Sequence, residues 1–307
     1  QNTSYLTYAV PQAYAQFQYM FDLDPEKTTT AAKGYYVVNL LRNYVNKGET
    51  AKAQAIINEA SKYATGNVVD ILNNYQKDLF ESPDDVLAYY EPALEEDPNN
   101  LEALKALESA HEELDNREEL AAIRKTLHEV NPSYQSASAL AKTEESNAQY
   151  SLAIKYYKEA LEMASSDEEK KQTNLSISSV YINDGDIKTA DRFVDAAIKL
   201  DPNFGQAYIN KARIYATAVT QCTENRKLEA KDRMVYWLVI DYLNMAKAKD
   251  PSVASTVNSQ LPNYTRVTPT GEDKFLRLDN LTDGQKVKID GSVASCYSWI
   301  NKTTTVR

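Results

Sequence analysis

Few residues of this chain have the types and spacing that catalysis or metal binding requires. Its two histidines, His111 and His128, stand 17 residues apart, whereas metal-binding histidines on a helix are usually spaced four apart or act with a CxxC pair. The sequence holds no phosphate-binding GxxxxGK[ST] loop, no GxGxxG, no GxSxG and no HExxH. Carboxylates are plentiful, but none is marked as a member of an acid–base pair. We therefore expect surface or packing histidines, no metal site, no cofactor and no enzymatic activity.

The two cysteines, Cys222 and Cys296, allow three interpretations. A disulfide between them needs an oxidising compartment. They could instead be two separate buried thiols, or half of a zinc site, for which two further ligands of suitable type are not evident. A disulfide would close a long loop, and chain entropy gives such a loop about 4 kcal/mol of stabilisation. That is enough to decide whether the end of the chain stays docked.

Helix-ending dipeptides recur along the chain and indicate its architecture. Proline cannot continue a helix and pushes the preceding residue out of the α region, so each dipeptide predicts a helix end. Pro98 and Pro132 are 34 residues apart, and Pro132 and Pro202 are 70 apart. A stop with this period indicates one helical unit copied along the chain. The five dipeptides are Asp24-Pro25, Asp97-Pro98, Asn131-Pro132, Asp201-Pro202 and Asp250-Pro251.

Residues 171–204 give a clear copy of this unit. Tyr181 lies midway along a first helix, Gly185 lies in a turn, and a second helix has an apolar face at Ala190, Val194, Ala197 and Ile198. The pattern resembles the tetratricopeptide repeat, a unit of about 34 residues that folds into two antiparallel helices. The resemblance covers roughly residues 12–251. It implies a mainly α, right-handed solenoid of about six helical hairpins with an N-terminal capping helix.

The resemblance also implies where a partner would bind. In tetratricopeptide proteins one face lines a concave surface, where arginine and lysine can grip a carboxylate, asparagine can bond to a peptide backbone and tyrosine offers contact area. An ordinary hydrated groove is the alternative for each position. The positions of this chain that map to the concave surface are Tyr35, Arg42, Asn46, Tyr75, Lys105, Lys142, Asn183 and Arg213.

The repeat spacing breaks near residues 218–232, where an insertion contains Cys222, and the pattern changes again after about residue 262. Residues 275–278 and 287–289 alternate as strands do, and the Thr-rich end of the chain favours strands. We predict a helical array over residues 1–262 and a small β-appendage of two or three strands over residues 263–307. The insertion cysteine, Cys296 with Trp299, and the closing Thr-Thr-Val-Arg resemble a subgroup of tetratricopeptide proteins from Gram-negative cell envelopes.

Composition and charge restrict the class of partner. The formal net charge is -10, and residues 81–120 hold 14 acidic residues against Lys105 and Arg117. This acidic segment is either the solvated face of acidic helices or a docking surface for a basic partner. The charge argues against nucleic acid, because binding phosphates needs a basic surface. No apolar run approaches the ~20 residues of a membrane span.

The sequence thus predicts a non-enzymatic scaffold that binds a protein or peptide in the groove of a repeat array. The envelope resemblance implies a periplasmic or outer-envelope location. The chain begins at Gln1 without Met, which a signal peptide removed before Gln1 or a boundary set by cloning would explain. The alternative is a glycan- or cell-wall-binding module that uses tyrosine and tryptophan surfaces, with Tyr297 and Trp299 exposed on the appendage.

Overall fold

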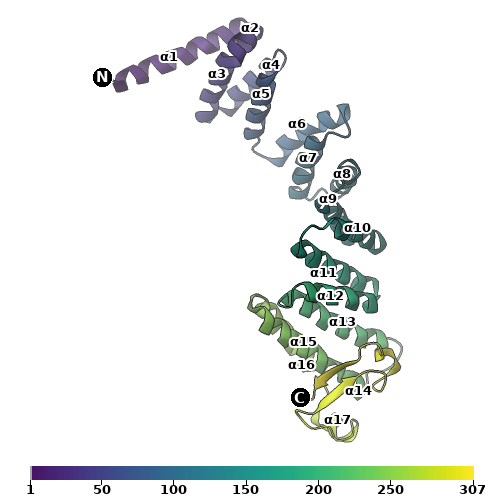
Figure 1. Cartoon of the computed structure of the whole chain (residues 1–307). Coiled ribbons are helices and arrows are strands. Elements are labelled where there is room, and N and C mark those ends of the chain that lie inside the picture. Colours follow the sequence, from purple (N-terminus) through teal and green to yellow (C-terminus); the bar gives the residue numbers. More distant parts are fainter. Residues whose placement is uncertain (1) are drawn as a thin grey trace. The chain divides into compact units, whose positions relative to one another are not determined.

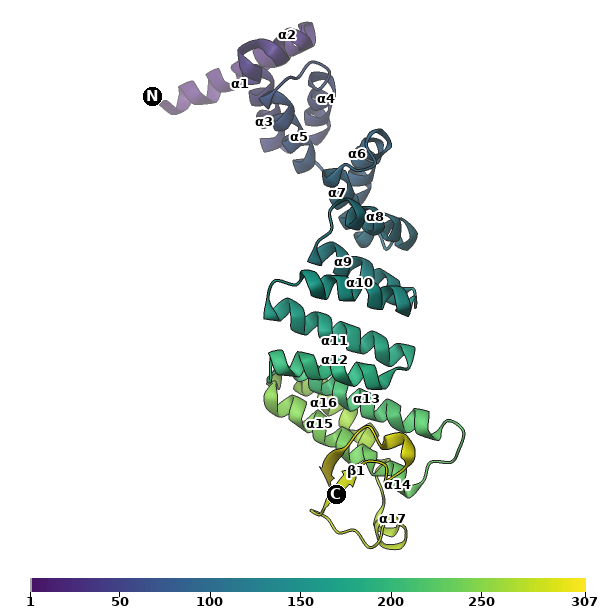
Figure 2. The same cartoon turned by 45° about the vertical axis from the view of Figure 1, so that its right-hand side comes forward.

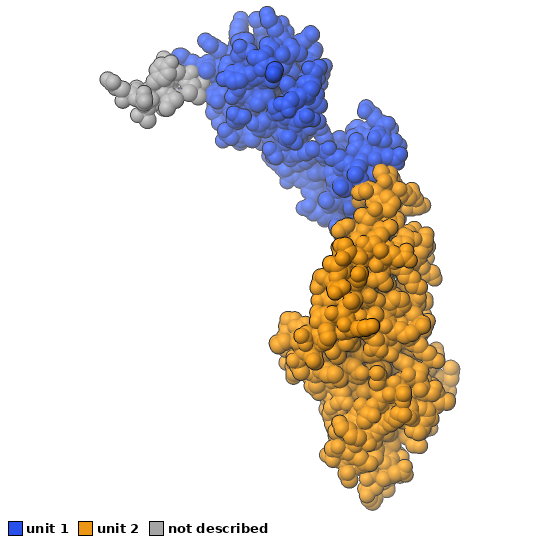
Figure 3. All heavy atoms as spheres, viewed as in Figure 1, with its two compact units in different colours: residues 1–123 blue, residues 124–307 orange. Residues whose placement is uncertain are grey.

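The computed structural model of the chain is mainly helical and has one small antiparallel sheet in its described part, near the C-terminus (Figure 1). The backbone is described for residues 2–307, and the side chains from Pro11 onward. Contacts divide the chain into two compact units, residues 1–123 and residues 124–307 (Figure 3). Each unit has its own buried core. The predicted helical-repeat fold with a small C-terminal sheet is confirmed.

The main core of the first unit joins α1, α3, α4 and α5. A second cluster around Tyr90, Ala103 and Leu107 joins α6 and α7. The elements are α1 (Asn2–Leu23), α2 (Pro25–Thr30), a 3-10 turn η1 (Ala31–Gly34), α3 (Tyr35–Asn46), α4 (Thr50–Ala60), α5 (Asn67–Asp78), α6 (Pro83–Glu96), α7 (Leu101–Glu113) and the first half of α8 (Arg117–Val130).

The second unit stacks helical hairpins and ends in the two strands. Within each hairpin the two helices pack along each other, and the first helix of one hairpin also meets the second helix of the hairpin before it. The elements are the end of α8, α9 (Tyr134–Ser146), α10 (Tyr150–Met163), α11 (Asp167–Asp184), α12 (Ile187–Leu200), α13 (Gly205–Thr223), α14 (Ala230–Arg233), α15 (Val235–Lys249), η2 (Pro251–Val253), α16 (Ala254–Thr265), α17 (Gly271–Leu276), β1 (Lys286–Ile289), η3 (Ser295–Tyr297) and β2 (Lys302–Thr305).

The Asp-Pro and Asn-Pro dipeptides end helices as predicted. The helices α1, α6, α8, α12 and α15 each stop at the residue directly before such a dipeptide. At three of them the residue before proline has a closely similar extended conformation, with φ between -135° and -139° at Asp97, Asp201 and Asp250. The proline ring excludes the helical conformation there, so the sequence itself places these ends.

The turns inside the hairpins use residues with left-handed backbone conformation. Between the first and second helices, φ is 67° at Gly48, 53° at Asp115, 56° at Ala148 and 91° at Gly185. Glycine adopts this conformation without steric cost, whereas an alanine pays for its Cβ atom. Ala148 therefore holds a strained turn between α9 and α10.

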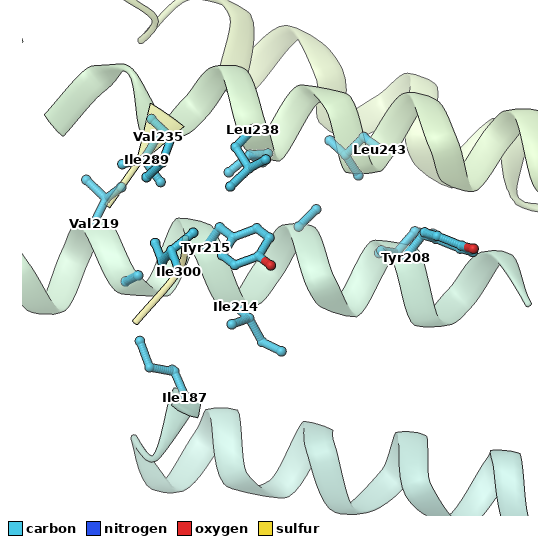
Figure 4. Close-up of a cluster of buried hydrophobic side chains, with 14 of the residues drawn as sticks. Ile187, Tyr208, Ile214, Tyr215, Val219, Val235, Leu238, Leu243, Ile289 and Ile300 are labelled. Carbon is cyan, nitrogen blue, oxygen red and sulfur yellow. The ribbon is translucent and has the colours of Figure 1, made fainter. Parts of the chain in front are cut away.

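The core of the second unit extends without a break into the C-terminal segment. Tyr215 on α13 belongs to one buried cluster with Val235 and Leu238 on α15 and with Ile289 and Ile300 of that segment. In Figure 4, Val235 lies beside Ile289, and Ile300 lies beside Tyr215. Strand β1 pairs antiparallel with β2, and β2 packs on α15. The strands therefore complete the core of the last hairpin.

A predicted strand at residues 275–278 is wrong. Residues 271–276 form the helix α17, and Phe275 and Leu276 are 66% and 64% exposed. Thr270 and Asp273 form a reciprocal capping box at the start of this helix, so local hydrogen bonds outweigh the apolar alternation. The insertion near residues 218–232 lengthens α13 to Thr223 and then continues through a loop into α14.

None of the described helices combines the length and the apolar character that crossing a bilayer requires.

Candidate functional site

In the first unit, a side-chain contact joins α3 and α5, which are the first helices of two consecutive hairpins. Arg42 on α3 donates a hydrogen bond from Nε to the hydroxyl of Tyr75 on α5, at 3.4 Å. This bond, and the partial charge of Tyr75, raise the pKa of Arg42. Tyr35 begins α3, is 57% exposed, and meets the rings of Phe17 and Tyr36 edge-on. The result is an exposed surface with aromatic rings and one guanidinium.

In the second unit, α11 and α13 are joined by the same kind of contact. Arg213 donates from Nη2 to Oδ1 of Asn183 at 2.5 Å, and Asn210 donates from Nδ2 to Oγ of Ser179 at 2.8 Å. Asn183 and Arg213 are exposed, whereas Asn210 is buried. The buried bond fixes the spacing of the two helices, and the exposed pair presents polar groups to solvent. We call Ser179, Asn183, Asn210 and Arg213 the first-helix ladder.

Tyr264, which was not among the predicted groove residues, lies near Arg213 of the first-helix ladder. Tyr264 lies on α16, which packs against α15. Burial raises the pKa of Tyr264, and the nearby positive charge of Arg213 opposes that rise. Sequence reasoning missed Tyr264 because the repeat pattern fades before α16. It could have found Asn210 and Ser179, since they stand about one repeat apart.

The three remaining predicted groove residues are exposed, and in the described part of the chain their side chains do not bond to any other predicted groove residue. Asn46 lies at the end of α3, Lys105 on α7 and Lys142 on α9. The structure therefore joins four of the eight predicted residues, as the pairs Arg42–Tyr75 and Asn183–Arg213. These pairs belong to different units.

The acidic segment of residues 81–120 lies on α6, α7 and the start of α8, all within the first unit. Thirteen of its 14 acidic side chains are exposed, and Glu108 is half-buried. Lys77 pairs with Glu102, and Arg117 pairs with Asp115 at 3.1 Å. The exposed carboxylates give this surface a strong negative potential.

A buried ion cluster lies between α12 and α13, next to the helix that carries Asn210 and Arg213 of the first-helix ladder. Lys211, 1% exposed, places Nζ 2.6 Å from Oδ1 of Asp191 and 2.7 Å from Oδ1 of Asp195. Burial raises the pKa of Asp191, and the ammonium of Lys211 opposes that rise. Because Lys211 lies on α13 and both aspartates lie on α12, the cluster holds these helices together and so positions Arg213.

The C-terminal segment is anchored around Asp232. Cys222 and Cys296 form a disulfide, with their Cα atoms 5.8 Å apart, which resolves the three interpretations in favour of the first. Arg226 donates two hydrogen bonds to Asp232, and the hydroxyl of Tyr297 donates a third at 2.8 Å. Burial alone would raise the pKa of Asp232, but these hydrogen bonds bring it below its usual value.

Tyr297 and Trp299 do not form the exposed aromatic surface that the glycan-binding alternative predicts on the appendage. Tyr297 is fully buried rather than exposed, and Trp299 is half-buried with its ring 6.1 Å from that of Tyr215. Strand β2 lies on α15, and Thr304 donates to Asp241 of that helix at 2.5 Å. The C-terminal segment is thus attached to α15 and to the end of α13. It leaves Arg213 of the first-helix ladder exposed.

The histidines have structural contacts. His111 is buried, and its Nδ1 lies 3.3 Å from the amide nitrogen of Asn116. His128 on α8 bridges to Ser136 on α9 at 3.0 Å and to Glu159 on α10 at 3.1 Å. Among the described residues, no three His, Cys, Asp or Glu side chains lie close enough to hold a metal ion.

Residues 172–204, which span most of α11 and α12, match the sequence profile of the tetratricopeptide repeat. This segment is therefore similar to one tetratricopeptide repeat. The matched repeat contains Ser179 and Asn183 of the first-helix ladder.

Several solved structures resemble the chain. The crystal structure of MamA is 18% identical, with 54% of this chain and 88% of MamA covered and a TM-score of 0.42. The structure of YrrB, described as a TPR protein with an unusual peptide-binding site, is 15% identical, with 80% and 97% covered and a TM-score of 0.42. A tetratricopeptide repeat protein from Parabacteroides merdae is 15% identical, with 75% and 97% covered and a TM-score of 0.42. No curated protein sequence matches the chain.

Proposed function

We propose that the chain is a non-enzymatic scaffold that binds an extended peptide or protein segment along its first helices. The observation that carries the proposal is the contact between Asn183 and Arg213, 2.5 Å apart and exposed on consecutive first helices. An amide can bond to a peptide backbone, and a guanidinium can grip a carboxylate. A second pair of the same kind, Arg42 and Tyr75, supports the proposal in the first unit.

The acidic segment favours a partner with basic residues. Its exposed carboxylates greatly outnumber the cations of the same segment, and such a surface attracts positive charge at long range. We propose that it accelerates the encounter, while the first-helix ladder makes the specific contacts. Added salt should then slow association much more than it speeds dissociation.

We propose the periplasm or outer envelope of a Gram-negative cell as the location. The disulfide between Cys222 and Cys296 supports an oxidising compartment. A free-thiol assay on protein purified from its native cells provides the test. We expect no reactive thiol without reductant, and two reactive thiols would contradict this location.

The binding proposal is tested by affinity capture from the native cell with three matched baits. These are the wild-type chain, Arg213→Glu with Asn183→Ala, and Lys199→Glu, an exposed change on the second helix of the same repeat. We expect specific partners on the wild type and on Lys199→Glu, and their loss on the double variant. Arg42→Glu tests the first unit in the same way. Partners that survive both groove changes would exclude these surfaces as the binding site.

A further inference from the structure

A hollow of about 390 Å³ lies on the second-helix side of the matched repeat. It is formed where α11 lies between α10 and α12 (Figure 2). Its lining includes Lys158 of α10, Asn174 and Tyr181 of α11, and Thr189, Arg192 and Phe193 of α12.

This hollow is separate from the first-helix ladder. Each residue of an α-helix advances by about 100°. Tyr181 and Asn174, seven residues apart, therefore share one side of α11, whereas Ser179 and Asn183 lie about 160–200° away from Tyr181. A ligand in the hollow would leave the ladder free.

One wall of the hollow is a flat aromatic pair. The rings of Tyr181 and Phe193 are stacked, with centroids 5.7 Å apart and an interplanar angle of 18°. Both side chains are half-buried and pack against the core around Ile177 and Val180. The core fixes the pair, which can receive another planar or apolar side chain at little entropic cost.

Two cations, Lys158 and Arg192, stand beside this wall and are not within ion-pair distance of any described carboxylate. Lys158 donates from Nζ to the hydroxyl of Tyr181 at 3.1 Å, and Arg192 donates from Nη2 to Oγ1 of Thr189 at 3.0 Å. Among the described residues, neither forms an ion pair, whereas Lys155 on α10 pairs with Glu159 at 3.8 Å. In a chain of net charge -10, two cations that line one hollow, form no direct ion pair and keep further N–H donors favour a negative ligand.

The surroundings favour a single negative charge. Asp186 already caps the start of α12, accepting a hydrogen bond from the amide of Thr189 at 3.1 Å. Hydrogen bonding from Thr189 is the main cause that lowers the pKa of Asp186, and the charge of Arg192 lowers it further. The ionised Asp186 repels a doubly charged phosphate more strongly than a singly charged carboxylate. A carboxylate therefore suits the site better.

We propose that this hollow binds a peptide carboxylate between Lys158 and Arg192, with a neighbouring aromatic side chain of the same peptide lying on Tyr181 and Phe193. The carboxylate could be an acidic side chain or a C-terminus, since both present the same group. An acidic peptide would thus occupy the second-helix side, whereas the first helices take a different segment.

Calorimetric titration of the full chain with short peptides tests the chemistry. Acetyl-Gly-Phe-Glu-Gly-amide carries a side-chain carboxylate, acetyl-Gly-Phe-Gln-Gly-amide carries none, and acetyl-Gly-Phe-Gln with a free end carries a terminal one. We expect at least one of the two carboxylate peptides to bind tenfold or more tightly than the neutral peptide, and the tighter one identifies the source. Equal binding of all three overturns the proposal, as does tighter binding of a phosphoserine peptide of the same length.

Paired variants locate the site. Lys158→Gln with Arg192→Gln should weaken carboxylate binding at least tenfold, which corresponds to about 1.4 kcal/mol. Lys155→Gln with Lys188→Gln removes the same charge from the same two helices outside the hollow, and should leave binding unchanged. All four side chains are exposed, so circular dichroism should show intact folds. Equal weakening by both pairs, or none by the first, overturns the proposal. Arg213→Glu should not affect this binding.

Discussion

Replacing Lys211 with methionine tests the buried ion cluster beneath the first-helix ladder. Lys211 is 1% exposed and lies within 2.7 Å of two carboxylates of α12. Methionine retains much of the apolar stem but removes the charge. Asp191, whose side chain is 18% exposed, then loses its nearest cation. We expect Lys211→Met to destabilise the second unit strongly.

The magnitude follows from the exposure of the partners. Removing one member of a fully buried ion pair costs about 3–5 kcal/mol, because the other charge is left uncompensated. Asp195 is 53% exposed, so water can solvate it, and Asp191 carries most of the penalty. We therefore expect a loss of about 3 kcal/mol in the free energy of unfolding at pH 7, at the lower end of that range.

The loss should depend on pH in a defined direction. Burial raises the pKa of Asp191 above its usual value, and Lys211 opposes that rise, so the variant should raise this pKa further. A carboxyl whose folded pKa is raised destabilises the fold when ionised, and protonation below that pKa relieves the cost. The difference between wild type and Lys211→Met should shrink as the pH falls from 7 toward the unfolded value of about 3.9.

Urea unfolding followed by circular dichroism at pH 7 and pH 5 measures this difference. Lys199→Met on α12 is the matched control, because Lys199 is exposed and its loss should change stability by less than about 0.5 kcal/mol. Adding Asp191→Asn to Lys211→Met should restore part of the loss. A loss below about 1 kcal/mol, or one that does not change with pH, would refute the assignment of a buried, stabilising cluster.

Three further changes have outcomes that the contacts predict. Ala148→Gly should stabilise the chain by about 1 kcal/mol in urea unfolding, because φ is 56° at this turn and glycine removes the steric cost; an unchanged or lower stability contradicts this. Cys222→Ser with Cys296→Ser should destabilise the chain by about 4 kcal/mol, with faster hydrogen exchange in β1 and β2, and unchanged exchange would argue against the anchor. Asp232 has a lowered pKa, so its contribution is present above about pH 3.9 and is lost as the pH falls through the folded value. Asp232→Asn should therefore lower stability at pH 7 and reduce its acid dependence, and parallel pH profiles would contradict this.

Local residue types were enough to predict the helical repeats. Proline excludes the helical conformation at the residue before it, whatever lies around it, so Asp97, Asp201 and Asp250 ended their helices as expected. The apolar spacing of Ala190, Val194 and Ala197 likewise predicted the buried face of α12. The same rules failed at Phe275 and Leu276, where a capping box produced a short helix in place of a strand.

The candidate sites depend on which side chains meet, and that was only partly predictable. The sequence assigned Arg42, Tyr75, Asn183 and Arg213 to one surface, and the structure shows that Arg42 contacts Tyr75 and that Asn183 contacts Arg213. The stacking of Tyr181 on Phe193 and the unpaired state of Lys158 and Arg192 carry no sequence signal. They result from how α10, α11 and α12 pack.

The sequence by itself determined where helices end and which face of each is apolar, because proline geometry and helical periodicity act over a few residues. Only the tertiary structure decided that Tyr297 is buried against Asp232 and that Cys222 meets Cys296. It also decided that Lys211 is buried between two aspartates. These contacts join residues distant along the chain, and they form because packing the last hairpin with the C-terminal strands buries apolar surface that neither part can cover alone.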